Sequence, residues 1–197
     1  MKRILLIICT LLIFQQVQFA QTRTNLDVVN DLIEKSVLNL DNSVINKNLT
    51  FNFIYRSSGS YSFLKSKVVD SYIKKVIPIS ENESLENKLE HSINNITVEY
   101  SNPYKDGFFG NLLIERKIHI DAALILSERA GIKTIDLSNS YKDTVEVENI
   151  SRLENPAIPF TQSTIPELPL FSNLLEPIIV VGTLIVTIIL FFTIRSK

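Results

Sequence analysis

The sequence predicts an α+β domain, in which a helix, a strand and a second helix precede an antiparallel meander, followed by a carboxy-terminal transmembrane helix. Three observations support this prediction. Apolar residues recur with helical spacing near the start of the domain, alternating segments fill its second half, and a final apolar run carries no charge over residues 178–194. Helices that cover one face of a sheet bury the apolar sides of both elements.

The first half of the domain changes between helical and strand periodicity. Residues 25–40 place Leu, Val, Ile, Val and Leu about one helical turn apart, which predicts an amphipathic helix. Residues 49–55 alternate apolar residues with Thr and Asn, as expected of a strand with one strongly apolar face. Residues 61–77 predict a second amphipathic helix that ends at Pro78. Residues 79–91 are polar and acidic and are interpreted as a loop or a short exposed helix.

In the second half of the domain the apolar residues follow a period of two. Residues 94–100 and 117–126 alternate in this way and are joined by a segment that contains Pro and Gly. Residues 132–138 predict a further strand after Ala-Gly, so residues 115–138 are interpreted as a β-hairpin. Residues 143–154 are interpreted as a strand followed by a short helix.

The amino-terminal end predicts export. A basic Met1-Lys2-Arg3 is followed by an apolar run over residues 4–14 that two Gln residues stop. This run is shorter than the roughly twenty residues of a membrane span, so residues 1–20 are interpreted as a signal peptide. Cleavage is expected after Ala20, and an uncut leader would leave the body on the same side of the membrane.

The carboxy-terminal end predicts a membrane anchor. Residues 173–194 would form a helix about 33 Å long, enough to cross the hydrocarbon core. Residues 195–197 contain Arg and Lys, which places this tail in the cytoplasm by the positive-inside rule. Gly182, Thr183 and Thr187 put small residues close together on the helix, a pattern that allows weak self-association through the anchor.

Between these ends, residues 21–154 have the length of one domain, and residues 155–172 are interpreted as an extended stalk. The single cysteine, Cys9, lies in the leader, which favours a bacterial periplasm over a eukaryotic exterior, where disulfides are common. Four Asn-x-Ser/Thr sequences point the other way, but they arise readily in a chain rich in these residues. The stalk prediction rests on four prolines: Pro156, Pro159, Pro166 and Pro169.

Charge and residue pattern exclude several function classes. The net charge of −1 argues against nucleic acid as the main partner, because phosphate binding needs clustered Lys and Arg. No nucleophile motif and no Gly-rich phosphate loop occurs in the sequence. No cofactor is therefore expected, and an enzyme is not the preferred interpretation.

One local candidate for ligand binding is the turn between the first strand and the second helix. Arg56, Ser58 and Ser60 could hold an anion there, because a helix amino terminus offers free N–H groups and a partial positive charge. The alternative is an ordinary turn, since Ser and Gly are also what turns and helix caps prefer.

A second candidate is the predicted hairpin. Lys117, His119 and Asp121 share one strand face, but two ligands at a spacing of two do not make a metal site, and nothing indicates that His91 converges on them. Sheet edges offer unpaired backbone groups to partners. We therefore predict an interaction strand marked by Lys117, Asp121 and Lys133.

Residues 96–100, 115–126 and 131–137 resemble the late strands of bacterial envelope domains, namely those of the curli-secretion lipoprotein and the amino-terminal domain of the Tol-system propeller protein. The resemblance covers about forty residues and includes no diagnostic motif. It implies a scaffold or assembly role without catalysis, and it transfers no functional residue. The sequence departs from these families by opening with a helix and by ending in an apolar span.

Together these observations predict a non-catalytic, single-pass protein of the bacterial inner membrane. Its body would lie in the periplasm, its carboxy terminus in the cytoplasm, and its partner would be another envelope protein. The alternative is a membrane-tethered ligand sensor or hydrolase with an anion site at residues 56–60. A convergent polar pocket around that turn would favour the alternative, and a featureless turn would favour the scaffold.

Overall fold

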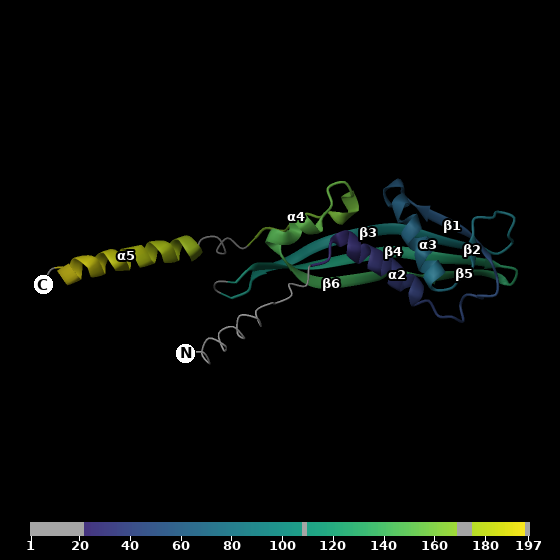
Figure 1. The fold of residues 1–197 in the computed structure, drawn as a ribbon, viewed down its shortest axis with the longest axis horizontal. Coiled ribbons are helices and arrows are strands. Elements are labelled where there is room, and N and C mark those ends of the chain that lie inside the picture. Colours follow the sequence, from purple (N-terminus) through teal and green to yellow (C-terminus); the bar gives the residue numbers. More distant parts are fainter. Residues whose placement is uncertain (1–21, 108–109, 169–174, 196–197) are drawn as a thin grey trace, which may run out of the picture.

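The computed structural model of the protein describes residues 22–107, 110–168 and 175–195. A sheet with helices packed on it is followed by a carboxy-terminal helix (Figure 1). In chain order the elements are α2 (Asn25–Leu38), β1 (Phe51–Ser57), the 3₁₀ helix η1 (Gly59–Leu64), α3 (Lys65–Lys74), β2 (Ile79–Ser80), β3 (Lys88–Lys105), β4 (Leu112–Glu128), β5 (Gly131–Asp136), β6 (Asn139–Glu146), η2 (Val147–Asn149), α4 (Ile150–Leu153), η3 (Pro159–Thr161) and α5 (Leu175–Arg195).

The described strands form one sheet in the order β2-β1-β3-β4-β5, with β6 also paired to β4. β1 runs parallel to both β2 and β3, and the remaining pairs are antiparallel. β5 pairs with residues 123–128 of β4 and β6 with residues 113–120, so the two act as one strand interrupted at residues 137–138. The α+β class and the order helix, strand, helix and antiparallel meander are confirmed.

The interpretation of residues 79–91 as a loop or a helix is wrong at both ends of this segment. Ile79 and Ser80 form β2, and β3 already begins at Lys88. The reason is that β1 provides a pairing edge on each side, and edge pairing imposes strand structure on short polar segments that lack a strand pattern of their own.

Helices α2 and α3 cover the same face of the sheet. α2 begins with a capping box, in which Thr24 and Asp27 bond to each other's backbone N–H. α2 contacts α3, β4 and β6, and Figure 1 shows α2 and α3 over the same side of the strands. β3 changes phase at a bulge between Ile93 and Asn95, which keeps its apolar residues toward the helices on both sides of the irregularity.

A buried polar network ties the first helix to the strands. Arg116 of β4 is 0% exposed and donates Nε to Asp143 Oδ1 (2.9 Å) and Nη2 to Oδ2 (2.6 Å). Its Nη1 donates to the side chain of Asn25 (2.8 Å) and to a backbone carbonyl just before α2 (2.9 Å). Asn25 Nδ2 donates in turn to Tyr100 Oη (2.9 Å) and to the Thr161 carbonyl (2.7 Å). Every member of this network has a partner.

The predicted stalk, residues 155–172, begins too early. Phe160 is 9% exposed, and its ring packs edge-on against Tyr61 (5.2 Å between centroids) and parallel to Phe63 (5.9 Å). Thr161 is fully buried and belongs to the Arg116 network. The domain therefore extends through Thr161, because one aromatic side chain among the prolines finds an apolar site beside η1.

The predicted signal peptide, residues 1–20, lies outside the described residues, as does the end of the predicted tail. A helix does follow near the predicted anchor: α5 spans Leu175–Arg195. Most of the large apolar side chains described along it, between Ile178 and Phe192, are exposed. Within the described part of the chain, no helix meets the combined requirement of length and hydropathy for a membrane span.

Candidate functional site: an apolar groove beside the open edge of β1

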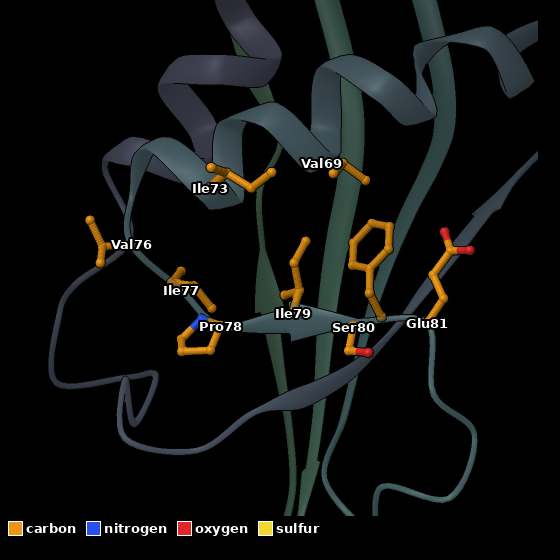
Figure 2. Close-up of a pocket in the computed structure, with 9 residues that line it drawn as sticks. Val69, Ile73, Val76, Ile77, Pro78, Ile79, Ser80 and Glu81 are labelled. Carbon is orange, nitrogen blue, oxygen red and sulfur yellow. The ribbon is translucent and has the colours of Figure 1, made fainter.

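An apolar groove of about 470 Å³ lies between α3 and the short strand β2. Figure 2 shows Val69 and Ile73 on the helix side and Ile79 pointing toward the helix from β2. Ile73 is 60% exposed and Val76 73% exposed, and both line the groove together with the partly buried Val69 and Ile79, so the exposed apolar surface here is contiguous. The groove is lined by Phe53, Val69, Ile73, Val76, Ile77, Pro78, Ile79, Ser80 and Glu81.

The end of α3 creates this groove. The Ile77 N–H donates to the Tyr72 carbonyl (3.1 Å), the bond of a Schellman helix end, and Val76 takes the left-handed conformation that such an end requires (φ 59°). Gly is the usual residue at this position, and a β-branched side chain is strained there. Pro78 then prevents continuation of the helix, so the chain turns back and lays β2 beside β1.

β2 covers only the start of the β1 edge. The register joins Phe51 to Ile79 and Asn52 to Ser80 and goes no further. The Phe51 N–H donates to the Pro78 carbonyl (3.0 Å), whereas the Asn52 N–H donates to the Asn87 carbonyl on the other side (2.8 Å). Odd-numbered amides of β1 therefore point toward the β2 side. From residue 53 to residue 57, no described strand lies along that side.

A second cavity, of about 590 Å³, lies along this open stretch. It shares Phe53 and Glu81 with the apolar groove, so the two cavities form one continuous surface, which we call the β1-edge groove. The combination of unpaired backbone groups with an adjacent apolar groove is how proteins bind an added strand. The second cavity is lined by Asn52, Phe53, Ile54, Tyr55, Lys65, Glu81, Glu83 and Lys88.

The charges around the β1-edge groove are balanced. Lys65 pairs with Glu81 (2.7 Å), while Glu83 and Lys88 form no ion pair with any described residue. Two other lysines of α3, Lys67 and Lys74, are directed to Glu34 of α2, and their hydrogen bonds lower the pKa of that carboxyl to about 2. Because these cations face α2, the groove wall of α3 stays apolar.

Beneath the groove lies a buried His–Tyr pair. The Tyr72 hydroxyl of α3 is 3.0 Å from Nδ1 of His91 on β3, and the ring of Tyr55 on β1 stacks on the imidazole (6.4 Å between centroids). Burial lowers the pKa of His91 to about 4 and raises the pKa of Tyr72, so both are neutral at pH 7. Nε2 of His91 has no hydrogen-bond partner among the described residues in either tautomer, so Nδ1 is the ring nitrogen that is satisfied there.

No hydrogen bond joins Arg56, Ser58 and Ser60 to one another in the described part of the chain, and the anion site stays a prediction. Arg56 Nε donates to Glu90 Oε1 (2.5 Å), which compensates its charge. Ser58 makes no capping hydrogen bond, and the helix that starts there is a 3₁₀ helix of six residues. Ser58 and Ser60 are exposed, and neither lines the β1-edge groove. The geometry is that of an ordinary turn.

The three residues of the predicted interaction strand do not share a face. Lys117 and Asp121 lie on the sheet face opposite the helices, because side chains alternate along a strand and their neighbours Ile118 and Ile120 are buried on the helix side. Lys133 pairs directly with the buried Leu126, so it lies on the helix side. Within the described residues, no group of three His, Cys, Asp or Glu side chains could hold a metal ion.

Sequence reasoning did not identify the β1-edge groove, because its β2 wall fell within the segment interpreted as a loop or helix. The signal that was present is Ile77-Pro78-Ile79 directly after the amphipathic helix. It places apolar residues beyond the proline that ends the helix, where a solvated loop would carry polar ones.

No protein family and no curated protein sequence matches the chain. Among solved structures, it is similar to rare lipoprotein B from Shewanella oneidensis, with a TM-score of 0.33 and 11% identity, covering 50% of this chain and 69% of that one. It is also similar to a minor lipoprotein from Acinetobacter baumannii, with a TM-score of 0.28 and 10% identity, covering 51% and 75%. Similarity at this level identifies neither a family nor a function.

Proposed function

We propose that this chain is a non-catalytic, membrane-anchored protein of the bacterial envelope, whose α+β domain binds another polypeptide through the β1-edge groove. The observation that carries the proposal is the groove itself: β2 stops after two residues and leaves the rest of β1 open beside exposed Ile73 and Val76. A polypeptide strand satisfies both features at once, because its backbone bonds to β1 while its apolar side chains enter the groove.

The chemistry of the groove supports binding rather than catalysis. The walls of its apolar cavity are mostly Val, Ile, Pro and Phe, and the polar side chains there are Ser80 and Glu81. Glu81 is paired with Lys65, which lines the second cavity. No histidine lines either cavity, and Ser80 has no base hydrogen-bonded to it among the described residues, as a nucleophile would require. His91 is buried under α3, and its Nδ1 lies at hydrogen-bond distance from the Tyr72 hydroxyl.

The anchor is supported by the sequence and by the exposure of α5. Residues 178–194 carry no charge, and the basic Arg195 and Lys197 follow. Most of the large apolar side chains described along α5 are exposed, among them Phe191 and Phe192, so no described part of the domain covers this surface. A lipid bilayer would cover it, and the basic tail would then lie in the cytoplasm.

Two measurements test the proposal. A reporter that is active only outside the cytoplasm should be active when fused after Glu167 and silent when fused after Lys197. The reverse pattern, or release of the chain from membranes by alkaline carbonate, would contradict the anchored topology.

The binding surface is tested in the same full-length chain. A photoreactive amino acid at Ile73 should form adducts with a polypeptide in cells, and the same amino acid at Ile132 should not. Ile132 is a matched control because it is 74% exposed on β5, near the opposite sheet edge. Adduct formation at Ile132 alone would place the binding surface elsewhere.

A further inference from the structure

A third cavity, of about 810 Å³, lies where β6 leads into η2 and α4, and we call it the α4 pocket. No described residue lines both this pocket and the β1-edge groove, which borders the opposite ends of β3 and β4. Apolar walls come from Tyr104 of β3, Leu113 of β4 and Leu153 of α4. Glu146 of β6 and Arg152 of α4 add one charge of each sign.

Neither of these two charges is neutralised within the described part of the chain. Glu146 and Arg152 form no ion pair with any described residue. Glu146 accepts hydrogen bonds from the side-chain amides of Asn111 at Oε1 (2.6 Å) and Asn149 at Oε2 (2.8 Å). These neutral donors orient the carboxylate and leave its charge in place. A ligand that carries one charge of each sign therefore matches the pocket better than an anion or a cation alone.

The donor and acceptor types narrow this ligand further. The guanidinium of Arg152 suits a phosphate, because its N–H groups can bond two phosphate oxygens at once. Thr22 and Thr144 line the same pocket with hydroxyls, which can donate to phosphate as well. Glu146 has further lone pairs that can accept from an ammonium group. Phosphoethanolamine joins a phosphate to an ammonium through a short ethylene link.

The pocket lies on the side of the domain toward the predicted anchor. Figure 1 shows α4 and the paired ends of β3 and β4 on the side of the domain that faces α5. Residues 162–174 join the domain to α5 and span at most about 45 Å when extended. Tyr104 is 45% exposed, and Tyr is favoured at membrane interfaces because it combines an apolar ring with a polar tip. Apolar walls beside charged groups suit the glycerol and upper acyl part of a lipid.

We infer that the α4 pocket binds the phosphoethanolamine headgroup of a phospholipid, with Arg152 on the phosphate and Glu146 on the ammonium. This inference rests on the anchoring in the proposed function, since the lipid comes from the membrane that holds α5. It does not depend on what binds in the β1-edge groove. Headgroup binding holds the α4 end of the domain at the membrane surface and keeps the groove, at the opposite end of β3 and β4, away from it.

The test uses the full-length chain in vesicles of equal parts phosphatidylethanolamine, phosphatidylglycerol and phosphatidylcholine. Photoreactive benzoylphenylalanine in place of Tyr104 captures lipid, and mass spectrometry identifies the headgroup of each adduct. The ethanolamine lipid should exceed each of the others about tenfold, the effect of one charge-assisted hydrogen bond, because glycerol lacks the ammonium and choline lacks its N–H groups. Adducts in the proportions of the vesicle would overturn the inference.

Two substitutions separate the roles of the charged residues. Arg152→Gln should abolish the preference for the ethanolamine lipid. Glu146→Gln should shift the preference to phosphatidylglycerol, because the phosphate site remains and the carboxylate that opposes an anion is gone. The matched controls Arg129→Gln, at the far end of β4, and Glu148→Gln, exposed beside the pocket, line no part of it and should keep the preference. An unchanged preference in both pocket variants would overturn the inference.

Free glycerophosphoethanolamine distinguishes a lipid from a soluble source of the same headgroup. In excess it should reduce the ethanolamine-lipid adducts and leave the other adducts unchanged, because it competes for the headgroup alone. If it raises the melting temperature of the chain while no lipid is captured at Tyr104, the ligand is soluble and the inference is wrong.

Failure of this inference is distinguishable from failure of the proposed function. If the chain resists alkaline carbonate and still captures a polypeptide at Ile73, but shows no headgroup preference at Tyr104, the inference alone falls. If carbonate releases the chain, the anchoring falls and the lipid source falls with it.

Discussion

Two buried polar side chains of the domain, Arg116 and His91, differ in how fully they are hydrogen-bonded within the described residues. Arg116 has partners for Nε and for both Nη atoms, drawn from β6, α2 and the segment before α2. His91 has one bond, to Tyr72 of α3, and its Nε2 has none. The two are far apart along the sheet: His91 faces Leu124 of β4, eight residues from Arg116 on that strand, or about 27 Å.

This difference shows which part of the fold is fixed and which part is adjustable. The Arg116 end is locked by a closed network of hydrogen bonds, and removing one member leaves others unpaired. The His91 end is held by aromatic packing under α3, the helix that forms a wall of the β1-edge groove. A binding surface that rests on aromatic packing can adapt to a partner more easily than one that rests on a closed network of hydrogen bonds.

The largest expected effect comes from breaking the locked end. Arg116→Ala should lower the free energy of unfolding by about 3–5 kcal/mol, because it leaves Asp143 and Asn25 without their buried partner. Denaturant unfolding of this variant is compared with Lys117→Ala, an exposed neighbour on the same strand, which should change stability by less than about 0.5 kcal/mol. Equal effects of the two substitutions would show that the network contributes no more to the free energy of unfolding than an exposed side chain does.

A second prediction tests where the domain ends. Phe160→Ala should destabilise the domain by about 3 kcal/mol, because the ring is buried against Tyr61 and Phe63. Ile165→Ala, which removes a more exposed apolar side chain five residues further on, should have little effect in the same thermal unfolding experiment. An unchanged melting temperature for Phe160→Ala would show that the residue belongs to the stalk and not to the domain.

The adjustable end predicts a pH dependence. The pKa of His91 is about 4 in the folded chain and about 6.5 when unfolded, so the unfolded chain binds more protons between these values. Stability should therefore fall as the pH is lowered from 6.5 toward 4, by about 2 kcal/mol at pH 5. His91→Phe should remove this part of the pH dependence, measured by urea unfolding at pH 7 and pH 5.

The other histidine serves as the control for this measurement. His119 lies on the sheet face opposite the helices and is only half-buried, so His119→Asn should leave the loss of stability at acid pH unchanged. A loss that persists in His91→Phe and disappears in His119→Asn would reverse the assignment.

The smallest expected effect concerns the helix end beside the groove. Val76→Gly should raise stability by about 0.5–1 kcal/mol, because the left-handed conformation strains a β-branched residue more than the added chain entropy of Gly disfavours folding. The side chain is 73% exposed, so its removal exposes little core. Val76→Ala keeps the Cβ atom and should gain less, as judged by denaturant midpoints.

Periodicity predicted the elements that bury one face. The helical stripe of residues 25–40 and the alternation of residues 117–126 correspond to α2 and β4, since burial of one face imposes those periods directly. β2 could not be predicted in this way, because two residues show no period and their strand structure depends on the β1 edge. Phe160 was assigned to a stalk by the prolines around it, although its packing site is provided by η1, about a hundred residues earlier.

Arg116 and His91 left a signal in the sequence that periodicity alone does not explain. Arg116 occupies the same phase of its strand as Ile114 and Ile118, and His91 the same phase as Leu89 and Ile93. A charged or polar residue in the apolar phase indicates either a bulge or a buried network. Which partners complete that network depends on residues distant in sequence, such as Asn25 and Asp143, and the alternation carries no information about them.

Backbone amide hydrogen exchange of the full-length chain in lipid vesicles, with and without the polypeptide captured at Ile73, tests most directly whether the groove end is the binding end. Residues 53–57 of β1 and residues 131–136 of β5 both belong to strands at the sides of the sheet, so they serve as test and reference within one molecule. Exchange in β1 should slow when that polypeptide is added, because the open edge pairs with it, while exchange in β5 should not change. Unchanged exchange in β1, or equal slowing of the two strands, would contradict this account.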